Sequence, residues 1–328
     1  MDDRPMFRGW GRAVWVAAGL LIVAATPGPA RAYPDKPIRL VVPSPPGGGT
    51  DTLARLVANK LTETLKWVFV PDNKPGAGGN IGMDAVAKAA PDGYTIGMGE
   101  SSNLTINPYL YAKMPYDVAK DLAPVVLVGT VPLVLVSAPA RQFPSIEAIV
   151  AAARSKPLTF ASGGNGTVGH LAGELWMRQA AIALQHIPYR GGAQAIADVV
   201  SAQVDIHFAS IPAAASFIEA GTVKAFAVTA PGRSPQLPGV PTMDEAGYKG
   251  FSAQVLYGVV TPAATPSAIV ETLNAAINRA LQSEDVRARL TRIGVEGRGG
   301  TPAEFGAFLE VERAKWSRTV VESGARVD

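Results

Sequence analysis

Short apolar runs alternate with amphipathic stretches along the chain, in the order typical of parallel α/β units. In the first third, β-rich runs at residues 38–42, 67–70 and 94–98 alternate with helical spacing at 53–61 and 81–89. The first run has no clean alternation of polar and apolar residues, as expected for a strand buried on both faces. The spacing therefore predicts a β-α-β-α-β arrangement with parallel strands.

The middle of the chain repeats this alternation, and the tail is helical. We expect further strands at 133–137, 158–161, 204–208, 223–229 and 255–260, and helices at 145–154, 170–181, 193–200 and 213–220. Helical periodicity then covers 266–282, 286–293 and 302–321, with no strand expected among them. A helical layer of this length must pack on another element. The first α/β unit is the simplest partner, which makes that domain discontinuous in sequence.

The composition excludes several classes of protein. Of the 328 residues, 48% are hydrophobic and 17% charged, which excludes a disordered chain. The absence of cysteine excludes disulfides, thiolate nucleophiles and iron–sulfur clusters. Three histidines leave little room for a metal site, and we expect no cofactor.

The net charge of +3 comes mainly from the N-terminus, where the first 32 residues hold four arginines and two aspartates. Without them the 30 basic and 27 acidic side chains become 26 and 25, a net charge of +1. A nearly neutral body argues against nucleic acid as a partner.

The N-terminus has the pattern of an export signal. Arg4, Arg8 and Arg12 precede an uncharged, mostly apolar run of 13 residues at 13–25, and the sequence Ala-Arg-Ala at 30–32 fits a cleavage site. The run is too short for a membrane span, which needs roughly 20 apolar residues. We expect cleavage after Ala32 and a mature protein in the periplasm, where no ATP or NAD pool is available.

Three glycine-rich loops each lie between a predicted strand and a predicted helix. Glycine lets a backbone approach a ligand closely, and the following helix offers free N–H groups with positive dipole character. Ligands of parallel sheets lie beyond the carboxyl ends of the strands. The loops therefore predict a cleft for an anion; they are residues 47–51, 76–80 and 162–167.

Single residues near these loops allow two interpretations each. Asp51 either caps its helix or orders the glycine loop against a ligand, and His170 either faces the cleft or closes its loop. His207, between two apolar residues of a strand, is more consistent with a structural role than with a catalytic base. Arg190 is a cation near the predicted cleft loops and a candidate for ligand contact.

Nucleotide-binding and catalytic patterns are weak. Residues 164–169 match G-x-G-x-x-G, but no acidic residue follows about 20 positions later. No G-x-S-x-G motif is present. The enzymatic alternative is an exported hydrolase with Ser162 or Thr50 as nucleophile, for which His170 is the plausible base; we favour a protein without catalysis.

The loops, in this order, resemble those of the extracytoplasmic solute receptors of tripartite tricarboxylate transporters, also called Bug proteins. The resemblance covers nearly all of residues 33–324. The matching stretches are 33–38 (YPDKPI), 46–51 (PGGGTD), 73–82 (NKPGAGGNIG), 91–95 (PDGYT), 107–111 (NPYLY), 115–117 (PYD), 161–167 (ASGGNGT), 170–174 (HLAGE), 188–192 (PYRGG), 240–242 (VPT) and 245–247 (EAG).

The resemblance implies an α/β periplasmic binding fold of type II, with two lobes closing on a small organic anion and delivering it to membrane permease subunits. It implies lobe 1 at 33–133 and 254–328 and lobe 2 at 134–253, after a signal peptide at 1–32. We place the two-segment hinge near 127–133 and 254–260. The helical tail packs on lobe 1, and we expect a monomer.

The family holds its ligand carboxylate largely through backbone N–H groups, hydroxyls and water. By position, the implied ligand-binding residues are Gly47, Gly48, Gly49, Thr50, Asp51, Gly78, Gly79, Ser102 and Asn103 in lobe 1, and Ser162, Gly163, Asn165, Thr167 and Ser210 in lobe 2. Where some members carry Asp after the phenylalanine matching Phe208, this chain has Ala209. We therefore expect an amine-free di- or tricarboxylate, or an aromatic carboxylate, as ligand. A sensor that docks on a two-component receptor kinase is an alternative with the same fold and ligand.

Overall fold

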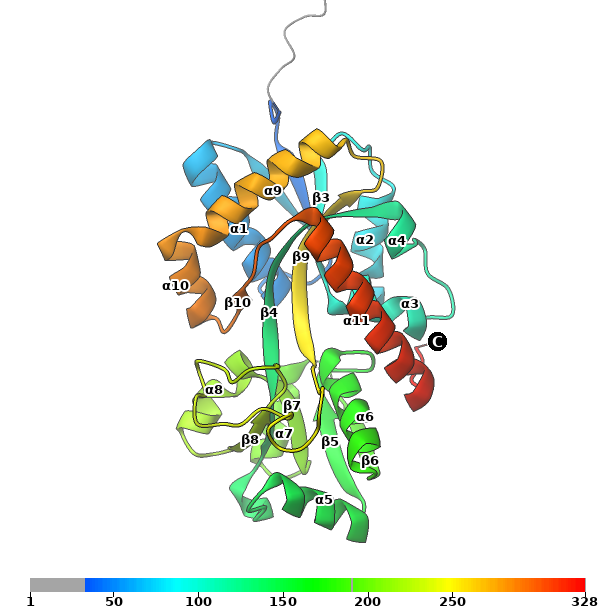
Figure 1. Cartoon of the computed structure of the whole chain (residues 1–328), viewed down its shortest axis with the longest axis vertical. Helices are drawn as coiled ribbons and strands as arrows, with labels where there is room; N and C mark the ends of the chain where they lie inside the picture. The colour runs from blue at the N-terminus through cyan, green and yellow to red at the C-terminus, as the bar shows by residue number, and fades with distance from the viewer. Residues whose placement is uncertain (1–32, 190, 328) are drawn as a thin grey trace, which may run out of the picture. The chain divides into compact units, whose positions relative to one another are not determined.

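The strands of the described residues, 33–189 and 191–327, join into a single ten-stranded sheet in a computed structural model of the chain (Figure 1). The predicted signal peptide with its cleavage site after Ala32 lies outside the described residues, as does Arg190. The main strand order is β2-β1-β3-β9-β4-β7-β5-β6, with β8 and β10 both paired to β4.

The first lobe begins with the predicted β-α-β-α-β unit. Its elements are β1 (Ile38–Val42), α1 (Gly49–Leu65), β2 (Phe69–Asn73), η1 (Ala77–Gly79), α2 (Asn80–Ala87) and β3 (Thr95–Glu100). β1 pairs in parallel with β2 on one side and β3 on the other, so all three carboxyl ends lie at one edge. The short segments η2 (Ser102–Ile106), α3 (Asn107–Leu110) and α4 (Val118–Asp121) follow.

Two long antiparallel strands connect the lobes. β4 (Leu122–Ser137) pairs with β9 (Gln254–Pro262) along its first part and with β7 and β8 along its last part. The sequence predicted only residues 133–137 of β4. Prolines at 124 and 132 interrupt the run, but both are accommodated within the strand. The pairing with β9 shifts register twice, between Pro124 and Val126 and between Leu127 and Gly129.

The second lobe repeats the α/β alternation. Its elements are η3 (Pro139–Arg141), α5 (Ile146–Ser155), β5 (Leu158–Ser162), α6 (Val168–Ala180), β6 (Leu184–Pro188), α7 (Gly192–Val200), β7 (Ile206–Ser210), α8 (Ile211–Glu219) and β8 (Lys224–Val228). β5 pairs in parallel with β6 and β7. β6 was not predicted, because this edge strand is only partly buried and its sequence contains Gln, His and Pro.

The tail contains α9 (Ser267–Gln282), α10 (Glu284–Arg292), β10 (Glu296–Gly297) and α11 (Pro302–Ser323). The expectation of no strand here is wrong: β10 pairs antiparallel with β4, a two-residue contact too short to leave a periodic signal. The tail packs on the first lobe, as predicted. Within the described residues, no helix is long and apolar enough to cross a membrane.

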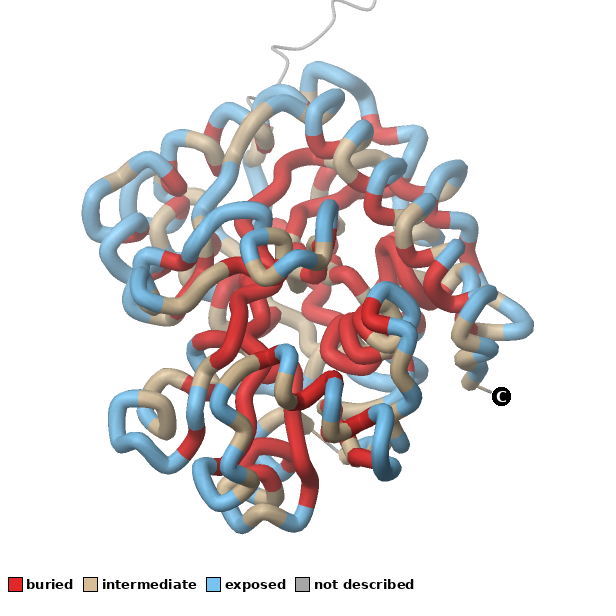
Figure 2. Tube along the Cα trace, turned by 60° about the horizontal axis from the view of Figure 1, so that its bottom comes forward, coloured by how far each residue is buried: buried red, intermediate tan, exposed pale blue. Residues whose placement is uncertain are grey.

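The last helix also reaches the second lobe. Phe305 and Leu309, near the start of α11, join an apolar core of the first lobe, whereas Trp316 and Val320 join a core that includes Trp176 of α6. In Figure 2 the buried residues follow the strands and the inward faces of the helices. On the side of α11, the two lobes therefore share an apolar core.

The loop that precedes α1 is fastened by a buried carboxylate. Asp51, in the first turn of the helix, accepts hydrogen bonds from the backbone N–H of Gly47 at 2.9 Å, from Arg55 Nε at 2.9 Å and from Asn73 Nδ2 at 3.0 Å. Burial alone would raise the pKa of Asp51, but these three hydrogen bonds outweigh it and lower the pKa to about 2. Of the two sequence interpretations, ordering of the glycine loop is the one observed, and Gly48 stands at the N-cap.

Replacing Asp51 should therefore make the stability depend on pH in a specific way. The pKa of Asp51 in the folded protein lies below its ordinary value of 3.8, so ionised Asp51 stabilises the fold above about pH 4, and this stabilisation is lost as the pH falls toward 2. At pH 7 we expect Asp51→Asn to lower the free energy of unfolding by on the order of 1–2 kcal/mol, discounted for the half-exposed Arg55 partner. Urea titrations between pH 7 and pH 2.5 should show the difference shrinking below pH 4, whereas Glu63→Gln, in an exposed ion pair, should have little effect at any pH. A constant difference across this range would contradict the assignment.

Trp316 provides a test of the shared core. Its side chain is fully buried, and its indole N–H donates to Glu312 Oε2 at 3.0 Å. Truncation to alanine should cost about 3–5 kcal/mol of unfolding free energy, as for other large core side chains. Val311→Ala, on the same helix but 67% exposed, is the matched control and should change stability by less than about 0.5 kcal/mol. Equal urea midpoints for the two variants would show that Trp316 does not anchor α11 in the shared apolar core.

Candidate functional site

The carboxyl edges of the two sets of parallel strands face each other along β4. In the first lobe, β3 ends at Glu100, which pairs with Tyr257, and Tyr257 pairs with Gly129 of β4. In the second lobe, β7 ends at Ser210, which pairs with Leu133 of β4. Gly129 and Leu133 are four residues apart on β4, which corresponds to about 13 Å at ~3.3 Å per residue. This spacing suits a small ligand rather than a polymer.

The N-terminus of α1 supplies unpaired donors at the first edge. The backbone N–H groups of Gly49 and Thr50 have no hydrogen-bond acceptor among the described residues, as is usual at the start of a helix. The Gly47 N–H, in contrast, is taken by Asp51, and the Asp51 carboxylate is already occupied by three donors. Within this loop, Gly49 and Thr50 therefore offer the backbone donors for an anion.

Two side chains next to these donors were not singled out from the sequence. Glu100 Oε2 accepts a hydrogen bond from Thr50 Oγ1 at 2.7 Å, and burial raises the pKa of Glu100 despite this bond. Tyr257 lies beside it on β9, where burial and the charge of Glu100 raise the pKa of the phenol. A Cβ at Gly49 would stand 2.9 Å from the Tyr257 hydroxyl. Glu100 follows a predicted strand, so the rule that placed the loops at carboxyl ends could also have found it.

A second group of predicted residues lies around the start of α2. Gly78 and Gly79 have positive φ angles of 62° and 89°, which favour glycine. Asn103 is fully buried: its Oδ1 accepts from the Glu100 N–H at 3.0 Å, while its Nδ2 has no partner. A Cβ at Gly79 would stand 2.5 Å from that Nδ2, so the two residues are in close contact. Ser102 is half-buried and its hydroxyl has no partner among the described residues.

Two helix N-termini converge in the second lobe. The N–H groups of Gly163, Asn165 and Val168 have no backbone acceptor among the described residues. A Cβ at Gly163 would stand 3.3 Å from the backbone nitrogen of Gly192, the first residue of α7. The starts of α6 and α7 therefore present unpaired donors close to one another, which favours a negatively charged group.

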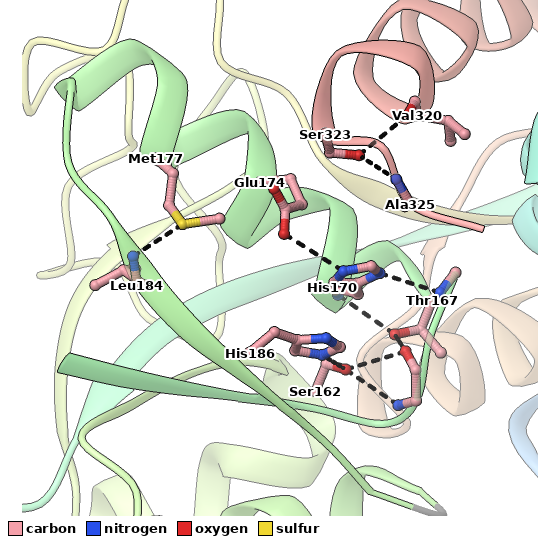
Figure 3. Close-up of polar contacts among 12 residues, drawn as sticks. Ser162, Thr167, His170, Glu174, Met177, Leu184, His186, Val320, Ser323 and Ala325 are labelled. Carbon is pink, nitrogen blue, oxygen red and sulfur yellow. Dashed lines mark hydrogen bonds and ion pairs between the residues drawn. The ribbon is translucent and has the colours of Figure 1, made fainter. Parts of the chain in front are cut away.

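The β5–α6 loop that carries these donors is held by side-chain hydrogen bonds (Figure 3). Ser162 Oγ accepts from the Gly164 N–H at 3.1 Å, and Thr167 Oγ1 donates to the Gly164 carbonyl at 2.8 Å and caps α6. His170 Nδ1 accepts from the Gly166 N–H at 3.1 Å, which places the ring proton on Nε2, 3.5 Å from Glu174 Oε1. His170 thus closes the loop, one of its two interpretations.

The hydroxyl of Ser162 also lies 2.7 Å from His186 Nε2, a distance typical of a nucleophile and its base. The base expected from the sequence was His170, which instead stacks on His186 with ring centroids 4.0 Å apart. Burial, with a smaller contribution from His170, lowers the pKa of His186 to about 3. Ser162 itself is fully buried. A weak base beside an inaccessible hydroxyl is unfavourable for nucleophilic catalysis.

The remaining predicted residues are distributed as follows. Asn165 is exposed, and Ser210 is half-buried at the start of α8 without a side-chain capping bond. Ala209 is 1% exposed within an apolar core. His207 is buried with its Nδ1 2.8 Å from the Ala161 carbonyl, consistent with the structural role expected for it.

The described residues contain no cluster of His, Asp and Glu suited to a metal ion. A cavity of about 410 Å³ lies elsewhere, between α9, α10, β10 and residues 234–236, and none of the predicted site residues lines it. The facing carboxyl edges hold the candidate site, and the donors identified there within residues 33–189 and 191–327 are backbone N–H groups.

The sequence matches the tripartite tricarboxylate transporter family receptor over residues 53–324. Protein BugT of Bordetella pertussis is 38% identical over 306 residues, covering 92% of this chain and 94% of BugT. A protein encoded in the tcbD-tcbE intergenic region of a Pseudomonas species is 41% identical over 294 residues, which cover 89% of this chain and 87% of that protein.

Two solved structures of relatives contain carboxylates. A protein of R. palustris solved with adipate has a TM-score of 0.80 and 34% identity, with coverage of 89% of this chain and 98% of that one. MatC from Rhodopseudomonas palustris, solved with bound malate, has a TM-score of 0.76 and 32% identity, with coverage of 88% and 100%. With its two α/β lobes and the match over residues 53–324, this chain belongs to the receptor family of the tripartite tricarboxylate transporters.

Proposed function

We propose that this protein is an extracytoplasmic solute receptor that captures a small organic carboxylate between its lobes and delivers it to a tripartite tricarboxylate-type permease. The observation that carries the proposal is the set of unpaired N–H groups at the starts of α1, α6 and α7, on carboxyl edges that face each other. The adipate and malate bound to two relatives support a di- or tricarboxylate, or a related aromatic acid, as ligand.

Closure follows from contacts with both lobes. A ligand carboxylate bound to one lobe gains additional hydrogen bonds only when the other lobe approaches, so the ligand favours the closed state. Micromolar affinity corresponds to about −8 kcal/mol. Several charge-assisted hydrogen bonds of ~1.5–3 kcal/mol each supply this after the costs of ordering. We place the hinge about which the lobes rotate at residues 127–133 and 254–260. The second lobe then consists of residues 134–253.

The cellular setting is part of the same proposal. Cleavage after Ala32 would release the mature protein into the periplasm as a monomer, where membrane permease subunits are its partners. A sensor docked on a receptor kinase would use the same fold and ligand. Genes for one small and one large membrane subunit beside this gene would favour transport over sensing.

Ligand-stripped mature protein should be stabilised by carboxylates. A ligand at 100 times its Kd adds about 2.7 kcal/mol to the unfolding free energy, which raises the Tm of a chain of this size by about 5 °C or more. We expect such a shift with adipate, malate or another di- or tricarboxylate, and none with the uncharged 1,6-hexanediol. Native mass spectrometry before stripping should detect a co-purified acid. No shift with any acid, together with turnover of an ester or amide that is lost in Ser162→Ala, would instead favour a hydrolase.

A methyl group at Gly49 should obstruct the site without unfolding the chain. The added Cβ would stand 2.9 Å from the Tyr257 hydroxyl, beside the free N–H groups of α1, at a backbone angle open to any residue. We expect Gly49→Ala to weaken carboxylate binding at least tenfold, measured by calorimetry, with an unchanged Tm in the absence of ligand. Gly239→Ala, where a Cβ meets nothing within 4 Å, is the control. Equal affinities for the two variants would exclude α1 from the site.

A further inference from the structure

The first lobe contains an acidic group where an anion is expected to bind. Glu100 Oε2 is engaged by Thr50, whose backbone N–H is one of the free donors at the start of α1. No lysine, arginine or histidine of the described residues forms an ion pair with Glu100. Its charge is therefore compensated by one hydroxyl and by the helix N-terminus alone.

The second oxygen of this carboxyl group is available to a ligand. Glu100 Oε1 has no hydrogen-bond partner among the described residues and is not one of the fully buried unpaired atoms, so it remains in contact with solvent. The same holds for the hydroxyl of Tyr257, paired with Glu100 across β3 and β9. Next to the donors of α1, the first lobe thus presents a carboxylate acceptor, Glu100 Oε1, beside the Tyr257 hydroxyl, which can donate or accept.

A plain carboxylate bound at α1 would meet this acceptor unfavourably. Two carboxylate oxygens in close contact repel unless a proton lies between them. A ligand hydroxyl next to the bound carboxylate supplies that proton and converts the repulsion into a charge-assisted hydrogen bond. Burial raises the pKa of Glu100, because it removes water from the carboxylate. A hydrogen bond that a ligand donates to this carboxylate is therefore stronger than it would be in water.

A hydroxyl fits this position better than an ammonium group. An ammonium has three N–H donors to satisfy when it is buried, whereas a hydroxyl has one. The backbone groups identified at the edge of the second lobe are N–H donors, with the Asn165 amide and the Ser210 hydroxyl as side chains that can accept, and the position after Phe208 is the apolar Ala209. Glu100 Oε1 would satisfy one of the three ammonium donors, and the other two would depend on these neutral acceptors or on water.

We propose that Glu100 is the specificity-determining residue of the site and selects hydroxycarboxylates, whose hydroxyl donates to Oε1 while the adjacent carboxylate binds the N–H groups of Gly49 and Thr50. This inference rests on the proposed function, since it assumes that a carboxylate binds at α1. It adds the chemical class of the ligand and its orientation, with the hydroxyl-bearing end toward the first lobe.

Matched pairs of acids that differ by one hydroxyl test the proposal. Calorimetry on ligand-stripped protein would compare malate with succinate, citrate with tricarballylate, and 2-hydroxyadipate with adipate, between pH 6 and pH 8. We expect the hydroxy acid of the tightest-binding pair to bind at least tenfold more tightly than its partner throughout this range. In Glu100→Gln the preference should fall below about threefold, mainly because the acid without the hydroxyl binds better. Glu63→Gln, on the exposed side of α1, should retain the preference.

Three results would overturn the assignment of Glu100. Equal affinities within each pair would show that the hydroxyl is not recognised, while the carboxylate receptor itself would stand. An affinity that rises for both members as the pH falls, with proton uptake, would show that Glu100 acts as a protonated donor. Tighter binding of aspartate than of malate would show that the site selects an ammonium group. If no acid bound at all, the proposed function would fail as well, so the two failures are distinguishable.

Discussion

The antiparallel pairing of β4 and β9 is the constraint on which the rest of the structure depends. β4 runs through both lobes, and its registers with β9 and with β7 fix where β3 and β7 end along it. A slip of one residue between β4 and β9 would shift Tyr257 and its partner Glu100 away from Gly129 and set the side chains of β9 on the wrong face of the sheet. The distance between the two carboxyl edges, and hence the size of a ligand that touches both, is set by a short stretch of β4.

Within that frame, the candidate site presents backbone dipoles, and several of its side chains hold the loops in place. Asp51 fixes the loop before α1, while Ser162, Thr167 and His170 fix the loop before α6. Each of these residues makes at least one hydrogen bond to a backbone group of its own loop, while neighbouring N–H groups stay unpaired. Binding then requires little ordering of the protein, which lowers the cost of association. The nearly neutral charge of residues 33–328 is consistent with a site of backbone donors, because such a site needs no cluster of arginines.

The sequence predicted the alternation of strands and helices well and the roles of side chains less completely. Periodicity located β1, α1, α2 and the helices from α5 to α11 to within a few residues, because their apolar positions face a core. It did not find α3 and α4, which are four residues long and too short to show a period. It did not find β6, whose edge position leaves it partly polar, or β10, which is two residues long. The glycine loops were recognised from their position after strands, but whether a residue such as Asp51 faces a ligand or its own loop depends on partners distant in sequence, here Asn73. Glu100 and Tyr257 meet only through the pairing of β3 with β9, 157 positions apart by their numbers, which no local pattern encodes.

The contacts between the lobes differ on the two sides of the β4–β9 pair, and this difference bears on how the lobes move. On one side, α11 places Trp316 and Val320 in a core that also contains Leu110 of the first lobe and Leu171 of the second. On the other side, the contact is smaller and partly polar: Gln236 Nε2 donates to the Thr291 carbonyl at 2.9 Å, next to the 410 Å³ cavity, and the Pro212 ring lies against Gly294. Separating the apolar side exposes buried area and costs free energy in proportion to it. A polar contact exchanges with water at little net cost. We therefore expect relative rotation of the lobes to meet its main resistance at α11 and to open more easily on the side of α10.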